Sequence, residues 1–273
     1  MLVDFHMHSV FSDGCLSPRE LVDQGRLHGL SMMALTDHDE IAGIASMIEA
    51  AGQDITIIPG MELSSSYKGK EVHILGYDFD CQNPLLHSYL DYFKARRLER
   101  IQKMVDRCQE NGYAISWADI QAIAPKTSAY GRPHIAQVLV QKGYAKDTNE
   151  AFDKILSSKG TCYVPKPKEA VDRVIDVIHD AGGYAVLAHP GLIKNDDYVK
   201  QILNFPIDGI EAYHTSHNFS QEDTYRSMAE NRGLFVTGGS DFHGIEGRYP
   251  TSIGEYTVES ELVEEFINLV SCD

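Results

Sequence analysis

Short apolar runs that alternate with helical patterns constrain the fold of this chain more than any other feature of its sequence. In the first part of the chain, strands are predicted at 2–6, 32–35, 55–59, 61–66 and 71–77, the last two as a hairpin around Gly69. Ser17, Pro18 and Glu20 form a capping signal for a first helix, and residues 41–51 form a second. This alternation indicates an α/β fold on a largely parallel sheet.

The middle of the chain has a different character. Between residues 83 and 157 the pattern is helical, with breaks at Asn111-Gly112, Pro125, 131–133 and Gly143. Alternation then returns, with helices predicted at 169–181, 196–203 and 221–231 and strands at 184–188, 209–213 and 234–237. We therefore expect one α/β domain, residues 1–80 and 168–273, interrupted by a helical subdomain at 81–167. About seven strands would fit a split barrel.

Composition excludes some classes of protein. The 40 acidic residues outnumber the 24 basic ones, and the formal charge of −16 argues against a broad footprint on long nucleic acid. A phosphorylated substrate stays compatible if metal ions supply positive charge in a pocket. The five cysteines are scattered without a CxxC pair, which favours a reducing compartment. Without a signal-peptide pattern or an apolar run of about 18 residues, we expect a cytoplasmic protein without a membrane partner.

Histidine, aspartate and glutamate collect where the predicted strands end. In chain order these residues are His6, His8, Asp13, Asp37, His38, Glu62, His73, His189, Asp241 and His243. Each has an ordinary alternative, such as a loop histidine or a solvated carboxylate. Taken together, with i, i+2 pairs at both ends of the chain, they predict a polynuclear metal site at the rim where strand ends converge.

Several of these segments resemble a known family. The motifs His6-Met7-His8, Thr36-Asp37-His38-Asp39, Gly60-Met61-Glu62, Ala188-His189-Pro190 and Ser240-Asp241-Phe242-His243 are similar to those of the PHP (polymerase and histidinol phosphatase) family, in the same order. The resemblance covers roughly residues 1–78 and 168–255. It implies a distorted (β/α)7 barrel, here with a helical insertion subdomain, and two or three divalent metal ions, commonly manganese, zinc or iron.

The resemblance also implies roles for individual residues. The first ion would bind His6, His8, Glu62 and Asp241; the second Glu62, His73 and His189; the third Asp13, His38 and His243. Asp37 is a candidate catalytic residue. His217, four residues after a predicted strand end, would donate a proton to the leaving oxygen, bind phosphate, or be a plain loop histidine.

Substrate-binding residues are expected outside the metal ligands. Arg132 and His134 flank Pro133 at a predicted helix start, which suits a second phosphate. Lys166 lies on a stiff stretch that re-enters the barrel, and Arg248 follows the Asp241–His243 motif. Each could equally be a surface residue. Tyr130 or Phe242 would either stack on a base or belong to the core.

These residues predict an enzyme that hydrolyses phosphate esters by metal-activated hydroxide attack on phosphorus, without a covalent intermediate. The resemblance favours nucleotide substrates, either 3′,5′-bisphosphonucleotides or short 5′-phosphorylated RNA ends. Two alternatives are a histidinol-phosphatase-like enzyme and a non-catalytic PHP binding module. The oligomeric state cannot be read from the sequence.

Overall fold

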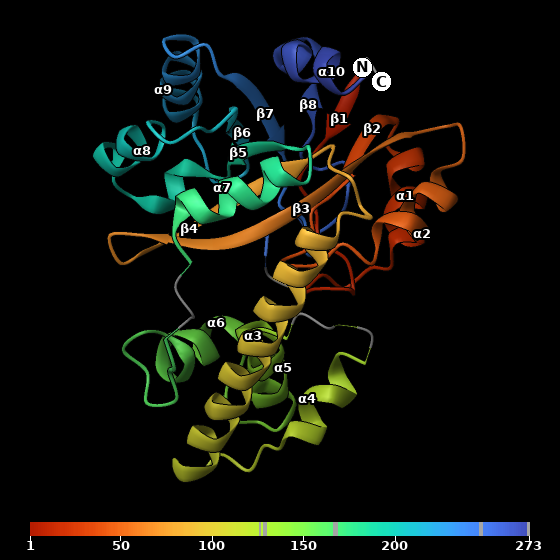
Figure 1. Cartoon of the computed structure of the whole chain (residues 1–273). Helices are drawn as coiled ribbons and strands as arrows, with labels where there is room; N and C mark the ends of the chain where they lie inside the picture. Colours follow the sequence, from red (N-terminus) through yellow and green to blue (C-terminus); the bar gives the residue numbers. More distant parts are fainter. Residues whose placement is uncertain (126, 128–129, 166–168, 246–247, 272–273) are drawn as a thin grey trace.

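The fold is built on one curved sheet (Figure 1). The computed structural model describes residues 1–125, 127, 130–165, 169–245 and 248–271. In the described chain, the sheet has eight strands in the order β7-β6-β5-β4-β3-β2-β1-β8. Their bounds are β1 Leu2–Asp4, β2 Leu30–Leu35, β3 Thr56–Tyr67, β4 Lys70–Tyr77, β5 Tyr184–Leu187, β6 Gly209–His214, β7 Phe235–Gly239 and β8 Val258–Glu259.

Hydrogen bonds that join the segment after β1 to the end of β7 and the residues that follow it bring the two sides of the sheet together. The Phe5 amide donates to the Gly238 carbonyl at 3.2 Å, and the Asp241 amide donates to the His6 carbonyl at 2.8 Å. Gly239 permits this approach, because a Cβ there would lie 2.4 Å from the His6 Cβ. The expected distorted barrel is confirmed, and β8, which sequence patterns did not indicate, adds an antiparallel strand beside β1.

The predicted strands at 55–59 and 61–66 are wrong as separate elements, because they form the single strand β3. Its first part pairs with β2 up to Pro59, and from Gly60 onward it pairs with β4. The Pro59-Gly60 pair is typical of a break between two strands, but here it marks the point where one continuous strand changes its partner. β4 runs antiparallel to both β3 and β5, so the beginning of β4 lies at the rim where the parallel strands end.

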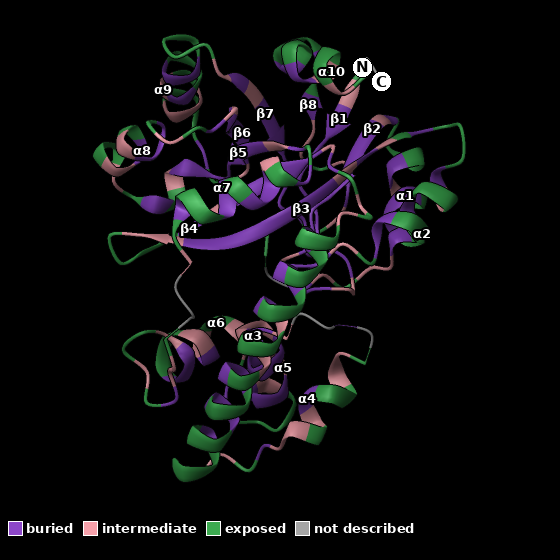
Figure 2. Cartoon of the chain, viewed as in Figure 1, coloured by how far each residue is buried: buried purple, intermediate pink, exposed green. Residues whose placement is uncertain are grey.

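Helices surround the barrel. Their bounds are α1 Pro18–Leu27, α2 Ile44–Ala51, α7 Val171–Asp180, α8 Asp196–Ile202, α9 Phe219–Glu230 and α10 Glu264–Val270. Ser17 and Glu20 form the predicted capping box of α1. Figure 2 shows that most strands are buried and that the helices turn exposed faces outward. No helix in the described part of the chain combines the length and apolarity needed to cross a membrane.

A helical segment interrupts the barrel between β4 and β5 (Figure 1). It contains α3 Pro84–Glu110, α4 Trp117–Ile123, α5 Arg132–Gln141, α6 Thr148–Ala151 and the π-helical turn η1 Phe152–Leu156. The first turns of α3, with Leu86 and Phe93, pack into the barrel's hydrophobic cluster, whereas Ile101 and Val105 belong to a separate cluster in the insertion. The long helix α3 therefore joins the two cores, and the domain boundaries near residues 80 and 168 stay a prediction.

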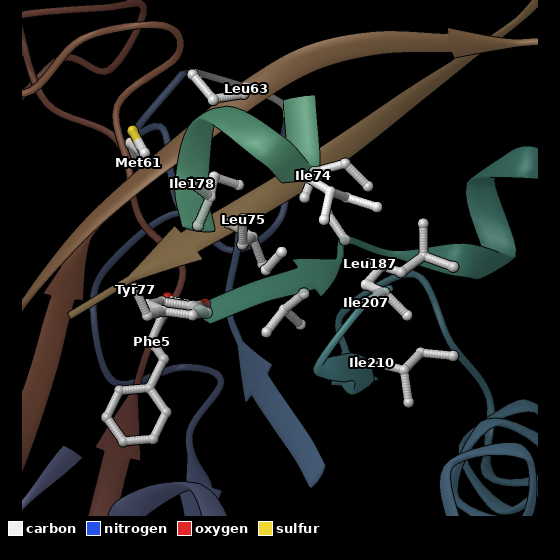
Figure 3. Packing of buried hydrophobic residues seen from close by; sticks show 14 of the residues in the cluster. Phe5, Met61, Leu63, Ile74, Leu75, Tyr77, Ile178, Leu187, Ile207 and Ile210 are labelled. Atoms are coloured by element: carbon white, nitrogen blue, oxygen red, sulfur yellow. Dashed lines mark hydrogen bonds between the residues drawn. The ribbon is translucent and has the colours of Figure 1, made fainter. Parts of the chain in front are cut away.

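Close packing between β4 and its neighbours stabilises the barrel (Figure 3). Ile74 and Leu75 of β4 are fully buried with Ile178 of α7 in one cluster. Tyr77 lies next to Phe5, and its hydroxyl donates to the Phe5 carbonyl at 2.7 Å. This hydrogen bond ties β4 to the segment that leads from β1 into the predicted metal site.

We predict that Tyr77→Phe lowers the free energy of unfolding by about 1–3 kcal/mol, because the buried Phe5 carbonyl loses a donor. Urea denaturation measures this change. Tyr67→Phe is the matched control, since the Tyr67 hydroxyl contacts Gln201 where it is only partly buried. Its effect should stay within about 0.5 kcal/mol. Equal losses in the two variants would contradict the role given to Tyr77.

Candidate metal centre

Imidazole and carboxylate groups from distant parts of the chain meet at the rim where the parallel strands end. Their potential ligand atoms form overlapping groups, within each of which all atoms lie within 4.8 Å of one another. These groups are His6, His8, Glu62 and Asp241; His8, Asp13, His38 and His243; His38, Glu62 and His73; and His6, Glu211 and His214, of which Glu211 and His214 were not among the expected ligands. The structure therefore brings together the residues that the family resemblance assigned to the first ion site, and it places the other expected ligands beside them.

Glu62 of β3 lies at the centre of this cluster and is 1% exposed. Its two carboxylate oxygens contact the imidazoles of His6, His8, His38, His73 and His189. Oε1 lies 2.7 Å from His73 Nδ1 and 2.8 Å from His189 Nε2. Oε2 lies 3.0 Å from His38 Nδ1. Because β3 continues past Pro59, Glu62 projects from inside a strand, not from the strand end that the sequence suggested.

Asp241 and Asp13 complete the cluster on two sides. Asp241 Oδ1 lies 3.2 Å from His8 Nε2, and Asp13 Oδ1 lies 3.3 Å from His243 Nε2. Asp241 has a φ of 52° and His189 a φ of 26°, so both have left-handed backbone conformations that are uncommon for residues with a side chain. Such strain concentrates at functional sites, where the surrounding structure holds it in place.

The donor set fits divalent metal ions. His6 Nε2, His8 Nε2, His38 Nδ1 and Glu62 Oε2 are buried atoms without a hydrogen-bond partner among the described residues, and they face one another. Buried polar atoms of this kind need a partner. Burial alone would raise the pKa of Glu62, but the neighbouring His38, His73 and His6 hold it well below its usual range. The carboxylate is therefore charged and available as a ligand.

Asp37 and His217, the two expected catalytic residues, make hydrogen bonds to the loops beside the cluster. Asp37 accepts hydrogen bonds from the Ser9 amide at 2.7 Å and from the hydroxyls of Ser9 and Ser12 at 2.6 and 2.5 Å. His217 Nδ1 contacts the Ala212 carbonyl at 2.8 Å, and its Nε2 accepts from the Gly191 amide at 3.1 Å. Their polar atoms thus make hydrogen bonds within these loops, and the direct catalytic roles of the two residues stay a prediction.

The expected substrate residues fall into three groups. Arg132 and Arg248 line a cavity of about 190 Å³ that also contains Glu62 and Asp241. Arg248 Nη2 donates to Asp241 Oδ2 at 2.6 Å, so it orients a candidate ligand. His134 is buried, and its Nδ1 accepts from the Gly131 amide at 3.0 Å at the start of α5, outside this cavity. Lys166 lies outside the described residues.

Some residues in and around this cavity were not expected from the sequence. Arg97 and Arg100 of α3 line its wall, and Arg97 Nη1 donates to Asp39 Oδ2 at 2.6 Å. Their i, i+3 spacing on a predicted helix was the available signal.

Phe242, one of the two aromatic candidates for base stacking, is 1% exposed and belongs to the core. The aromatic wall of the cavity is instead formed by Phe152.

We predict that the affinity for Mn²⁺ rises steeply between about pH 6 and about pH 9. Burial alone would lower the pKa of His8, but Asp241 and Glu62 raise it to about 9. Glu62 and Glu71 likewise raise the pKa of His73 to about 9 against the effect of burial. A metal must displace these protons, so affinity should change by about tenfold per pH unit for each proton released.

Isothermal titration in buffers of different ionisation enthalpy measures both the affinity and the protons released. Titration of Mn²⁺ into a chelator of known protonation constants serves as the control. An affinity that stays constant over this pH range would contradict the prediction.

Comparisons with known proteins agree with this geometry. The model of the PHP domain family matches residues 4–233. The 5'-3' exoribonuclease Rnm of Escherichia coli K12 is 32% identical over 251 residues, which cover 89% of this chain and 85% of that protein. The 3',5'-nucleoside bisphosphate phosphatase of Chromobacterium violaceum is 32% identical over 247 residues, which cover 88% of this chain and 87% of that protein.

A solved structure from Bifidobacterium adolescentis, described as a metal-dependent phosphoesterase, superposes with a TM-score of 0.87 and 33% identity. The match covers 97% of this chain and 95% of that one. These findings confirm the resemblance seen in the motifs, the barrel fold and the expectation of a phosphoric ester hydrolase. By the family model and by its relatives, the chain belongs to the PHP domain family.

Proposed function

We propose that this protein is a metal-dependent phosphoesterase that acts on nucleotides with a second phosphate, either 3′,5′-bisphosphonucleotides or short RNAs with a 5′-phosphate. The observation that carries this proposal is the lining of one cavity. Candidate metal ligands, including Asp13, Glu62 and His243, form part of its lining, and arginines from the helical insertion form another part. A phosphate ester could therefore contact metal ions and guanidinium groups at the same time.

Arg100 supports an anion site in this cavity. It is 4% exposed, and its Nη2 has no hydrogen-bond partner among the described residues. Burial, with the nearby charge of Arg132, lowers the pKa of Arg100 to about 10. Buried cationic groups that repel one another are stabilised by an anion between them. We infer that a substrate phosphate supplies this negative charge.

The N-terminus of α5 adds to the same anion site. Gly131, Arg132 and Pro133, where α5 begins, line the cavity. Gly131 has no side chain to cap the helix, and among the described residues His134 Nδ1 accepts only from the Gly131 amide. Backbone N–H groups at a helix N-terminus favour an anion. Arg132 also lies 5.5 Å from the centre of the Phe152 ring, which positions its guanidinium along the cavity wall.

The metal ions proposed for this centre number two or three and are Mn²⁺, Zn²⁺ or Fe²⁺, because imidazole and carboxylate without thiolate suit these metals. When bound, such ions would activate water and neutralise charge on the phosphoryl oxygens. Arg100 and Arg132 would hold the second phosphate, and Arg248 would keep Asp241 oriented. The net charge of −16 fits a short RNA end or a mononucleotide better than a long duplex.

A substrate panel tests the proposal. With Mn²⁺, we expect phosphate or nucleotide release from 3′,5′-bisphosphonucleosides or 5′-phosphorylated short RNAs to exceed release from histidinol phosphate by at least about tenfold in kcat/KM. Exhaustive chelation should abolish activity, and Mn²⁺ should restore it. A preference for histidinol phosphate would favour the alternative enzyme. Full activity without metal would contradict the mechanism, and inactivity on every substrate would favour a binding module.

Arg132→Ala tests the second-phosphate site. We expect kcat/KM for a bisphosphonucleoside to fall about 10- to 100-fold, because a charge-assisted contact is lost, with a much smaller fall for a simple aryl phosphate. Steady-state kinetics on both substrates measure this difference. Arg226→Ala is the matched control, since Arg226 is exposed on α9 and pairs with Asp223. Equal losses on both substrates would indicate a structural role for Arg132.

A further inference from the structure

Glu211 is a buried carboxylate that the expected ion sites do not include. It lies on β6, is 0% exposed, and stands in register with Thr237 of β7. Burying a charged carboxylate inside a barrel is unfavourable unless its oxygens are engaged by hydrogen-bond donors. The partners of Glu211 therefore indicate what the residue does.

Each oxygen of Glu211 contacts a different candidate ligand. Oε1 lies 2.8 Å from His6 Nδ1. Oε2 accepts a hydrogen bond from the backbone amide of His189 at 2.7 Å. One carboxylate thus joins the segment that follows β1 to the segment that follows β5, at the two points where these segments deliver an imidazole to the cluster.

The contact with His6 selects one form of its ring. A carboxylate can only accept, so a hydrogen bond to it requires the proton on Nδ1. In the neutral ring, Nε2 then carries the lone pair, and this nitrogen lies 3.5 Å from Glu62 Oε2 and 3.6 Å from Asp241 Oδ1. The lone pair therefore points to the place where an ion would bind, on the opposite side of the ring from Glu211.

The contact with His189 holds a strained backbone. His189 has φ 26° and ψ 62°, which is unfavourable for a residue with a side chain. Its amide is buried, and the Glu211 carboxylate supplies the acceptor. In this conformation His189 Nε2 lies 2.8 Å from Glu62 Oε1. Loss of the acceptor would leave the amide unsatisfied and allow the backbone to relax away from the cluster.

We propose that Glu211 is a positioning residue for the metal centre: it sets the proton of His6 on Nδ1 and fixes the backbone of His189, so that both imidazoles are prepared for metal ions before these bind. Hydrogen bonds from metal-binding histidines to carboxylates commonly tune metal affinity in this way. The inference rests on the metal centre and is independent of the substrate proposed above.

Glu211→Gln is the informative variant, because an amide of nearly the same shape has only one accepting oxygen. If that oxygen keeps the His189 amide, the NH₂ group faces His6 Nδ1 and favours a proton on Nε2, which removes the lone pair from the ion site. Glu211→Asp keeps a carboxylate at a shorter reach. Thr237→Val is the matched control, since it alters a buried side chain beside Glu211 and leaves both carboxylate contacts in place.

Two measurements decide the proposal without an activity assay. Competition titration with a chromophoric chelator measures Zn²⁺ affinity and the number of ions bound at saturation. Nitrogen-15 NMR of labelled histidines in the zinc-loaded protein reports which nitrogen of His6 carries the proton. Circular dichroism and thermal melts establish that each variant is folded.

We expect wild-type His6 to be protonated on Nδ1. Glu211→Gln should weaken Zn²⁺ binding about 10- to 100-fold with an unchanged number of ions at saturation. Glu211→Asp should weaken Zn²⁺ binding less than Glu211→Gln does, and Thr237→Val should bind Zn²⁺ with wild-type affinity. Wild-type affinity in Glu211→Gln, or a wild-type His6 with its proton on Nε2, would overturn the proposal. Loss of a whole ion at saturation would also overturn it, because Glu211 would then be a ligand itself. If Glu211→Gln does not fold, the position of the His6 proton in the wild-type protein, measured by NMR, still tests the proposal.

Discussion

Glu62 places a negative charge inside the protein, and the surrounding groups are arranged to stabilise it. The carboxylate is 1% exposed and contacts imidazoles from β4 and from the segments that follow β1, β2 and β5. A buried charge without partners is strongly destabilising. Imidazoles at 2.7 to 3.0 Å reduce this cost. Divalent cations would reduce it further, so the same arrangement that stabilises Glu62 also forms a metal site.

The barrel makes this convergence possible through local departures from a regular parallel sheet. β3 continues past Pro59 and carries Glu62 toward the rim, and the antiparallel β4 brings His73 to the same place. Gly239 has no side chain, so the end of β7 approaches the segment after β1 closely enough for His6 and Asp241 to face one another. Beneath them, Glu211 contacts His6 and the His189 backbone. The geometry of the metal centre thus depends on contacts made by residues that are not themselves expected ligands, such as Gly239 and Glu211.

The helical insertion contributes the opposite charge. The chain is acidic overall, with a formal charge of −16, yet Arg97, Arg100 and Arg132 gather on the wall that faces the metal centre. The buried ion pair between Arg97 and Asp39, at 2.6 Å, links this wall to the loop after β2. The helix α3 packs into both the insertion and the barrel. It therefore keeps the arginines of the insertion next to the acidic residues of the barrel in one cavity.

Local sequence patterns predict the order of strands and helices, the capping of α1 and the residues of the metal cluster. They can do so because periodicity, capping residues and i, i+2 spacing are properties of neighbouring residues.

Residues 55–66 could not be predicted as one strand, because only the exchange of β2 for β4 as partner explains how a strand passes through Pro59-Gly60. The hydrogen-bond partners of Asp37 and His217 could not be predicted either, because Ser9, Ser12, Ala212 and Gly191 meet these side chains only in the folded chain. Glu211 carries no signal of its own in the sequence, and the i, i+3 spacing of Arg100 with Arg97 does not show that Arg100 is buried. Their importance arises from burial and from partners far along the chain, and these are set only when the tertiary structure forms.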